Sequence, residues 1–196
     1  MKKIAFAVAT FAIFIACNNS SEKNETGDTS VVDNIHHPDG TVPVTDSPGN
    51  TTVNDTDREF ALKAGMGNTG EIEAGQLAVQ RANGNDVKEF GNMMIKDHGD
   101  AQSRLKGIAA SLSLNAPDSV DQEHKDLKTK LSGLSGKAFD KEYITAQVKD
   151  HRATVTLFEK QISSGTNSQL KEFATSTLPH IKMHLEKAEA LQAANK

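Results

Sequence analysis

Apolar residues recur at spacings of three and four residues in four long stretches of the chain. This spacing predicts amphipathic helices, because residues three and four apart lie on one helical face. The four stretches cover about 57–82, 86–113, 139–163 and 168–191. Their apolar faces are expected to pack together in an all-α domain.

The segment between the second and third stretches, Leu114–Ala138, is too long for a simple turn. Antiparallel neighbours in a bundle need only about two to eight connecting residues. The segment carries a short amphipathic piece near Leu127–Leu134. Bundles with one long crossover are of the ferritin-like type. We therefore predict a ferritin-like four-helix bundle over residues 56–194, with a crossover that contains a short helix.

The first residues resemble an export signal. Lys2 and Lys3 precede an apolar run, Ile4–Ala16, which is too short to span a bilayer comfortably. Cys17 follows a small residue, as in bacterial lipoproteins. We predict a signal peptide over 1–16, acylation of Cys17, and attachment to a membrane through its lipid.

The residue after the cysteine, Asn18, favours the outer membrane of the bacterial envelope over the inner membrane. Residues 17–55 are rich in Asn, Ser, Thr, Asp and Gly and contain few apolar residues. Such a composition cannot bury enough surface to form a core. We predict a polar, disordered linker between the lipid and the helical domain.

Composition excludes some classes of function. Charged residues make up 24% of the chain with both signs interspersed, and the net charge is −4. This pattern gives no basic face for nucleic acid. The sequence contains no Ser/His/Asp nucleophile motif and no glycine-rich phosphate loop, so we assign no catalytic residue.

Four ionisable residues lie on the apolar stripes of the four predicted helices. They are Glu71, His98, His151 and His184. At about 1.5 Å per residue, each lies near the middle of its helix, whichever way the helix runs. One carboxylate and three imidazoles are therefore expected to meet in one layer.

Two interpretations of this layer remain open. It could bind one divalent metal ion (Zn, Fe or Mn), since imidazole with one carboxylate suits these ions. His180, four residues before His184, could then add a ligand. Alternatively, the four groups form a hydrogen-bonded cluster that only fixes helix packing, because buried polar groups need partners.

A di-iron oxidase site does not fit the sequence. Such sites use Glu-x-x-His pairs on two of the helices. The residues three positions before the inward histidines are Ile95, Val148 and Ile181. A standard ferroxidase is therefore not predicted.

Several short segments resemble one family. They are Asp57–Phe60, Glu71–Ala78, Val87–Phe90, Met94–His98, Phe139–Tyr143, Val148–His151, Leu157–Lys160, Leu170–Ala174 and Leu178–Leu185. Together they are similar to the bacterial exported "domain of unknown function 4142" family, whose members are often described as outer-membrane proteins or lipoproteins.

The resemblance covers Asp57–Leu191 and implies a ferritin-like bundle. The recurrent polar positions of the family correspond here to Glu71, His98, His151 and His184, whereas His180 departs from the family pattern. The resemblance implies no activity. We predict a lipid-anchored envelope protein with a non-catalytic metal-binding domain. The alternatives are an envelope interaction module and a mononuclear metal-dependent enzyme, and no protein partner or oligomeric state is predicted.

Overall fold

In the computed structural model of the protein, the structure is described for residues 52–194. The predicted signal peptide, Cys17 and nearly all of the predicted linker lie outside these residues. Between residues 52 and 194 no helix is both long and apolar enough to cross a membrane.

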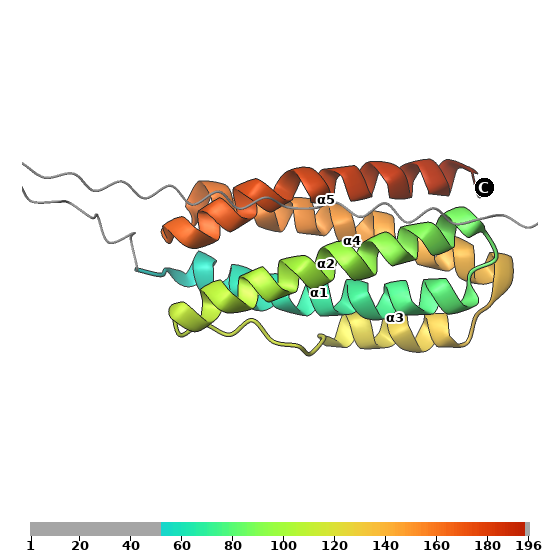
Figure 1. Cartoon of the computed structure of the whole chain (residues 1–196), viewed down its shortest axis with the longest axis horizontal. Helices are drawn as coiled ribbons and strands as arrows, with labels where there is room; N and C mark the ends of the chain where they lie inside the picture. The colour runs from blue at the N-terminus through green and yellow to red at the C-terminus, as the bar shows by residue number, and fades with distance from the viewer. Residues whose placement is uncertain (1–51, 195–196) are drawn as a thin grey trace, which may run out of the picture. The chain divides into compact units, whose positions relative to one another are not determined.

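Five α-helices and no β-strand make up the described part of the chain (Figure 1). The helices are α1 (Asp55–Arg81), α2 (Asn85–Ser111), α3 (Gln122–Ser132), α4 (Gly136–Ser164) and α5 (Ser168–Ala194). The hairpin α1–α2 packs against the hairpin α4–α5, and α3 lies outside against α1 and α4. This arrangement confirms the predicted ferritin-like four-helix bundle.

The crossover is required by the direction of the helices. In Figure 1, α2 and α4 run the same way along the bundle, so the chain must return along its full length between them. The extended segment after α2 and then α3 make this return. A short helix was predicted in the crossover, and α3 confirms it at a position several residues earlier than the apolar spacing indicated.

Local signals fix the helix ends. At the start of α1, Asn54 and Asp57 form a reciprocal capping box, in which each side chain accepts a hydrogen bond from the other's backbone N–H at 2.9 Å. At the start of α3, the side chain of Asp121 accepts a hydrogen bond from the backbone N–H of His124.

The turn between α1 and α2 is held by a distant residue. Buried Asp140 of α4 accepts hydrogen bonds from the backbone N–H groups of Asn83 and Gly84, at 2.8 and 3.0 Å. The N-cap of α2 is Gly84, which has no side chain for capping. The hydrogen bonds from α4 therefore replace the side-chain caps that are present at the starts of α1 and α3.

Helices α1 and α2 approach closely where two glycines face each other. A Cβ atom on Gly75 would lie 2.8 Å from the carbonyl oxygen of Gly91, and one on Gly91 would lie 2.9 Å from that of Gly75. Neither backbone can yield easily at such distances. The close spacing of α1 and α2 therefore requires glycine at both positions.

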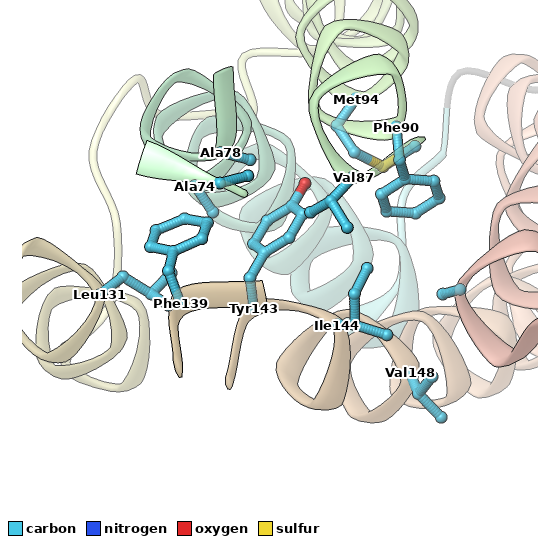
Figure 2. Packing of buried hydrophobic residues seen from close by; sticks show 12 residues of the cluster. Ala74, Ala78, Val87, Phe90, Met94, Leu131, Phe139, Tyr143, Ile144 and Val148 are labelled. Atoms are coloured by element: carbon cyan, nitrogen blue, oxygen red, sulfur yellow. The ribbon is translucent and has the colours of Figure 1, made fainter. Parts of the chain in front are cut away.

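Two apolar clusters fill the bundle on either side of a polar layer. One cluster contains Phe90, Phe139, Tyr143 and Ile144, among other residues. Figure 2 shows the rings of Phe139 and Tyr143 projecting from α4 toward α1. The other cluster contains Phe60, Leu105, Phe158, Leu170 and Phe173 with their neighbours. On each long helix, the predicted polar residue lies between the segments that supply the two clusters.

Candidate metal centre

Three histidines from three helices meet inside the bundle. His98 of α2, His151 of α4 and His184 of α5 are 3%, 1% and 1% exposed. Their ring centroids lie 5.5 to 5.7 Å apart. One ring nitrogen from each histidine lies within 4.8 Å of those from the other two. The structure thus brings together three of the four inward residues that the sequence predicted.

Each ring is held by one hydrogen bond from one of its two nitrogens. The pairs are His98 Nδ1 with Asn68 Oδ1 at 2.9 Å, His151 Nδ1 with the Gln147 carbonyl at 3.0 Å, and His184 Nε2 with Asp97 Oδ2 at 3.0 Å. A backbone carbonyl and a carboxylate only accept hydrogen bonds, and an amide oxygen does likewise. In each neutral ring, the proton is therefore assigned to the nitrogen that faces this acceptor.

The second nitrogen of each ring has no such partner. His98 Nε2, His151 Nε2 and His184 Nδ1 are fully buried and make no hydrogen bond within residues 52–194. Leaving one buried acceptor unsatisfied typically costs about 1–3 kcal/mol. Three rings that meet inside the bundle therefore each keep one nitrogen available to a ligand, and buried histidines with a free nitrogen and a bonded one are typical of metal sites.

The environment keeps these rings neutral. Burial lowers the pKa of His98 well below its usual value, and the neighbouring histidines add to this effect. Burial also lowers the pKa values of His151 and His184 to about 4. All three imidazoles are thus in the form that binds metal at neutral pH.

Glu71 lies behind His151 and outside the group of three. The Nε2 of Gln147 donates a hydrogen bond to Glu71 Oε2 at 2.5 Å. Glu71 Oε1 lies 3.6 Å from His151 Nδ1, the nitrogen already bonded to the Gln147 carbonyl. Burial raises the pKa of Glu71 to about 7. In this position, Glu71 is better placed to orient His151 and to balance the charge of a bound ion than to coordinate the ion directly.

His180 also lies outside the group. Its side chain is exposed, on the turn of α5 before His184. It borders a cavity of about 210 Å³ beside the histidines, together with Asp97, Thr177 and other residues.

Two buried amides contribute to the layer and were not singled out from the sequence. Asn68 donates to the side-chain oxygen of Gln102 at 3.3 Å, and Gln102 donates to the carbonyl of Pro117 at 2.9 Å. Asn68 lies three residues before Glu71 and Gln102 lies four residues after His98. Both therefore share a helical face with a predicted site residue, and this spacing is the signal that could have found them.

The histidine centre has cavities on two sides. The larger, of about 410 Å³, is bounded by α1, α3 and α4, and its wall includes Asn68, Glu71 and His98. The smaller cavity is bounded by α2 and α5, and its wall also includes His98. Small ions and solvent can therefore approach a residue of the centre from either side.

Comparison with known proteins assigns the chain to a family. The sequence profile of the family described as "Domain of unknown function (DUF4142)" matches residues 42–191. The chain belongs to this family. This DUF4142 chain matches no curated protein.

A solved structure supports the fold of the DUF4142 chain. The crystal structure of a DUF305 protein from Streptomyces coelicolor, inferred to be secreted, aligns with a TM-score of 0.62 at 15% identity. The alignment covers 71% of this chain and 92% of the other. At this identity the likeness concerns the helical fold alone.

Proposed function

We propose that this DUF4142 domain binds one divalent transition-metal ion through His98, His151 and His184. The observation that carries the proposal is that three buried rings each have an unpartnered nitrogen and that one ring nitrogen of each lies within 4.8 Å of those of the other two. In a tetrahedral zinc site with bonds of about 2.0–2.1 Å, ligand nitrogens lie about 3.4 Å apart. The nitrogens here lie within 4.8 Å, so modest ring movements would complete the site.

The donor set favours particular ions. Three neutral imidazoles suit Zn²⁺, Fe²⁺ and Cu²⁺ better than Mg²⁺ or Ca²⁺, which prefer oxygen ligands. With Glu71 behind His151, the case for Mn²⁺ is weaker than the sequence alone indicated. Zn²⁺ is therefore the first ion to test.

The hydrogen-bond partners of the rings support the same proposal. Histidines that bind metals usually donate their other N–H to a carboxylate, a carbonyl or water, which fixes the ring orientation. Asp97, Asn68 and the Gln147 carbonyl supply such acceptors here. A layer that only fixed helix packing would be expected to use both nitrogens of each ring for hydrogen bonds.

A second candidate function, a mononuclear metal-dependent enzyme, is favoured by one observation. His98 borders cavities on two sides of the centre. Catalytic zinc sites use three protein ligands and keep one position for water or substrate. Detectable hydrolysis by the zinc-loaded protein, lost in a histidine variant, would favour the enzyme over a binding domain.

We also propose that the protein resides in the bacterial envelope and is anchored by acylated Cys17. The apolar run ending at Ala16 and the DUF305 neighbour that is inferred to be secreted support this location. Incorporation of labelled fatty acid into the protein, abolished by Cys17→Ser, tests the anchor. Equal labelling of both proteins would contradict it.

Metal content tests the main proposal. The full chain, carrying Cys17→Ser to remove the thiol and no polyhistidine tag, is freed of metal, incubated with Zn²⁺ and desalted. We expect about one retained ion per chain by mass spectrometry, and loss of this ion in the double variant His98→Ala/His184→Ala. The control His180→Ala removes an exposed histidine of the same helix and should retain the ion.

Circular dichroism establishes that each variant remains helical. No retained ion in the parent protein would overturn the metal proposal. Equal retention by the parent and the double variant would place the ion elsewhere and would overturn it as well.

A further inference from the structure

The larger cavity beside the histidines has an acidic wall. Of its charged residues, five are carboxylates and only two are lysines. The carboxylates are Glu59, Glu71, Asp121, Glu123 and Asp150. Its volume of about 410 Å³ has room for on the order of ten waters. A hydrated divalent ion, with about six waters in its first shell, would fit.

Three of these carboxylates already have a cationic or imidazole partner. Glu59 pairs with both lysines of the wall, Lys63 at 2.7 Å and Lys160 at 2.6 Å. Glu123 pairs with Lys149, which lies outside the cavity wall. Asp121 lies 2.7 Å from the Nδ1 of His124. The charge of the wall is thus compensated mainly at these positions.

The two remaining carboxylates, Glu71 and Asp150, are different. Neither forms an ion pair with Lys or Arg in the described part of the chain, and the Asp150 carboxylate makes no hydrogen bond there. Both belong to the wall of the same cavity, so a cation held there would offset the charge of both carboxylates.

A histidine of the proposed metal centre also belongs to this wall. His98 belongs to the same wall, is 3% exposed, and its Nε2 has no hydrogen-bond partner within residues 52–194. The wall of one cavity therefore contains two carboxylates without a Lys or Arg partner and a histidine of the proposed metal centre that has one unpartnered nitrogen.

The smaller cavity does not share this character. Its two carboxylates, Asp97 and Asp100, both lie within ion-pair distance of Lys96, at 3.4 and 3.1 Å. Arg104 and His180 also belong to its wall, and Arg104 forms no ion pair in the described residues. A divalent cation is therefore drawn to the larger cavity and not to the smaller one.

We propose that the larger cavity is an outer cation site, in which Glu71 and Asp150 hold a hydrated divalent metal ion before it passes to the three histidines. This inference rests on the proposed function, because it assigns the loading route of the same centre. Its ligand class is a hydrated divalent transition-metal ion held by carboxylate oxygens, whereas the inner site replaces water by imidazole nitrogen.

The rate of metal uptake tests the outer site. Metal-free full chain, with Cys17→Ser in every sample, is mixed with Co²⁺ in a stopped-flow spectrometer, and the visible absorption of bound Co²⁺ is followed. Asp150→Asn removes one charge and no hydrogen bond. We expect its association rate at low salt to fall roughly fivefold, with weaker salt dependence, because fewer charges steer the ion.

The matched control is Asp100→Asn, which removes a carboxylate from the smaller cavity. It should leave the association rate unchanged, and both variants should still bind about one ion per chain at equilibrium. An unchanged rate in Asp150→Asn, or an equal loss of rate in Asp100→Asn, would overturn the outer site while leaving the histidine centre intact. Failure of the parent protein to bind Co²⁺ or Zn²⁺ at all would overturn both proposals.

Discussion

The carboxylate of Asp97 lies 3.0 Å from Nε2 of His184 and reaches it from a different helix. Asp97 is itself one residue before His98, so a single turn of α2 supplies one histidine and orients another. The carboxylate holds the proton of His184 on Nε2 and leaves Nδ1 free for a ligand.

Replacing Asp97 by Asn should therefore weaken metal binding without abolishing it. Loss of such a supporting carboxylate typically lowers metal affinity about 10- to 100-fold. We expect a change in this range for Zn²⁺, measured by competition with a chelator of known affinity. Asp100→Asn, one turn further along α2, is the control, and equal affinities in the two variants would show that Asp97 has no orienting role.

The depressed histidine pKa values predict an unusual tolerance of metal binding to acid. An exposed histidine, with a pKa of about 6.5, is largely protonated at pH 5 and cannot bind metal. His151 and His184, with pKa values of about 4, remain neutral there. Between pH 7 and 5 the affinity for Zn²⁺ should fall by less than about tenfold, and it should fall steeply near pH 4.

Titration calorimetry at pH 7, 6, 5 and 4 measures this profile. Because Glu71 titrates near pH 7, the same series in Glu71→Gln separates its contribution from that of the histidines. A thousandfold or greater loss of affinity between pH 7 and 5 in both proteins would contradict the prediction.

Glu71 should also influence the stability of the metal-free protein. Its pKa is raised in the folded state to about 7, so its stabilising contribution is present below its unfolded value, near 4.5, and is lost as the pH rises through 7. Gln at this position stays neutral and can still accept the hydrogen bond from Gln147. At pH 8, metal-free Glu71→Gln should exceed the parent in free energy of unfolding by about 2–3 kcal/mol.

Urea unfolding of both proteins at pH 5 and pH 8 provides the measurement. The difference between them should be small at pH 5, where Glu71 carries a proton in the folded protein. A difference of the same size at both pH values would mean that shape, and not charge, accounts for the effect.

Gly91 should tolerate no side chain. Gly91→Ala places a methyl group 2.9 Å from the Gly75 carbonyl oxygen, so α1 and α2 must move apart. We expect a loss of roughly 2–3 kcal/mol in the free energy of unfolding, as for other overpacked positions. Gly99→Ala on the same helix meets nothing within 4 Å and should stabilise by about 0.5–1 kcal/mol through helix propensity. Thermal unfolding of the two variants compares them directly.

The sequence predicted the long helices well because their apolar spacing extends over many turns. α4, for example, begins at Gly136 and ends at Ser164, against a predicted span of 139–163. α3 begins at Gln122, earlier than predicted, because its first turn is exposed and polar and contributes nothing to an apolar pattern. Its start is fixed by the Asp121 cap, which only the local sequence signals.

The convergence of the histidines could be predicted from their heights along the helices, but their orientation could not. Height follows from the rise per residue, which varies little between helices. Orientation depends on acceptors such as Asn68 and Asp97, which come from other helices. Glu71 shares the predicted height, yet it faces Gln147 one turn before His151. The direction in which a side chain points between two helices depends on its packing contacts, and the spacing of apolar residues along the sequence does not reveal these contacts.

The three histidines belong to both hairpins of the bundle, one to α1–α2 and two to α4–α5. An ion bound by them would therefore cross-link the two halves of the domain and close a loop, from His98 to His151, that contains all of α3. Closing a long loop restricts the unfolded chain more than the folded one. The chain has a single cysteine and cannot form an intramolecular disulfide. A bound metal ion would give the chain a reversible cross-link in place of a disulfide. This cross-link would form only where the ion is available, and a stronger chelator would remove it.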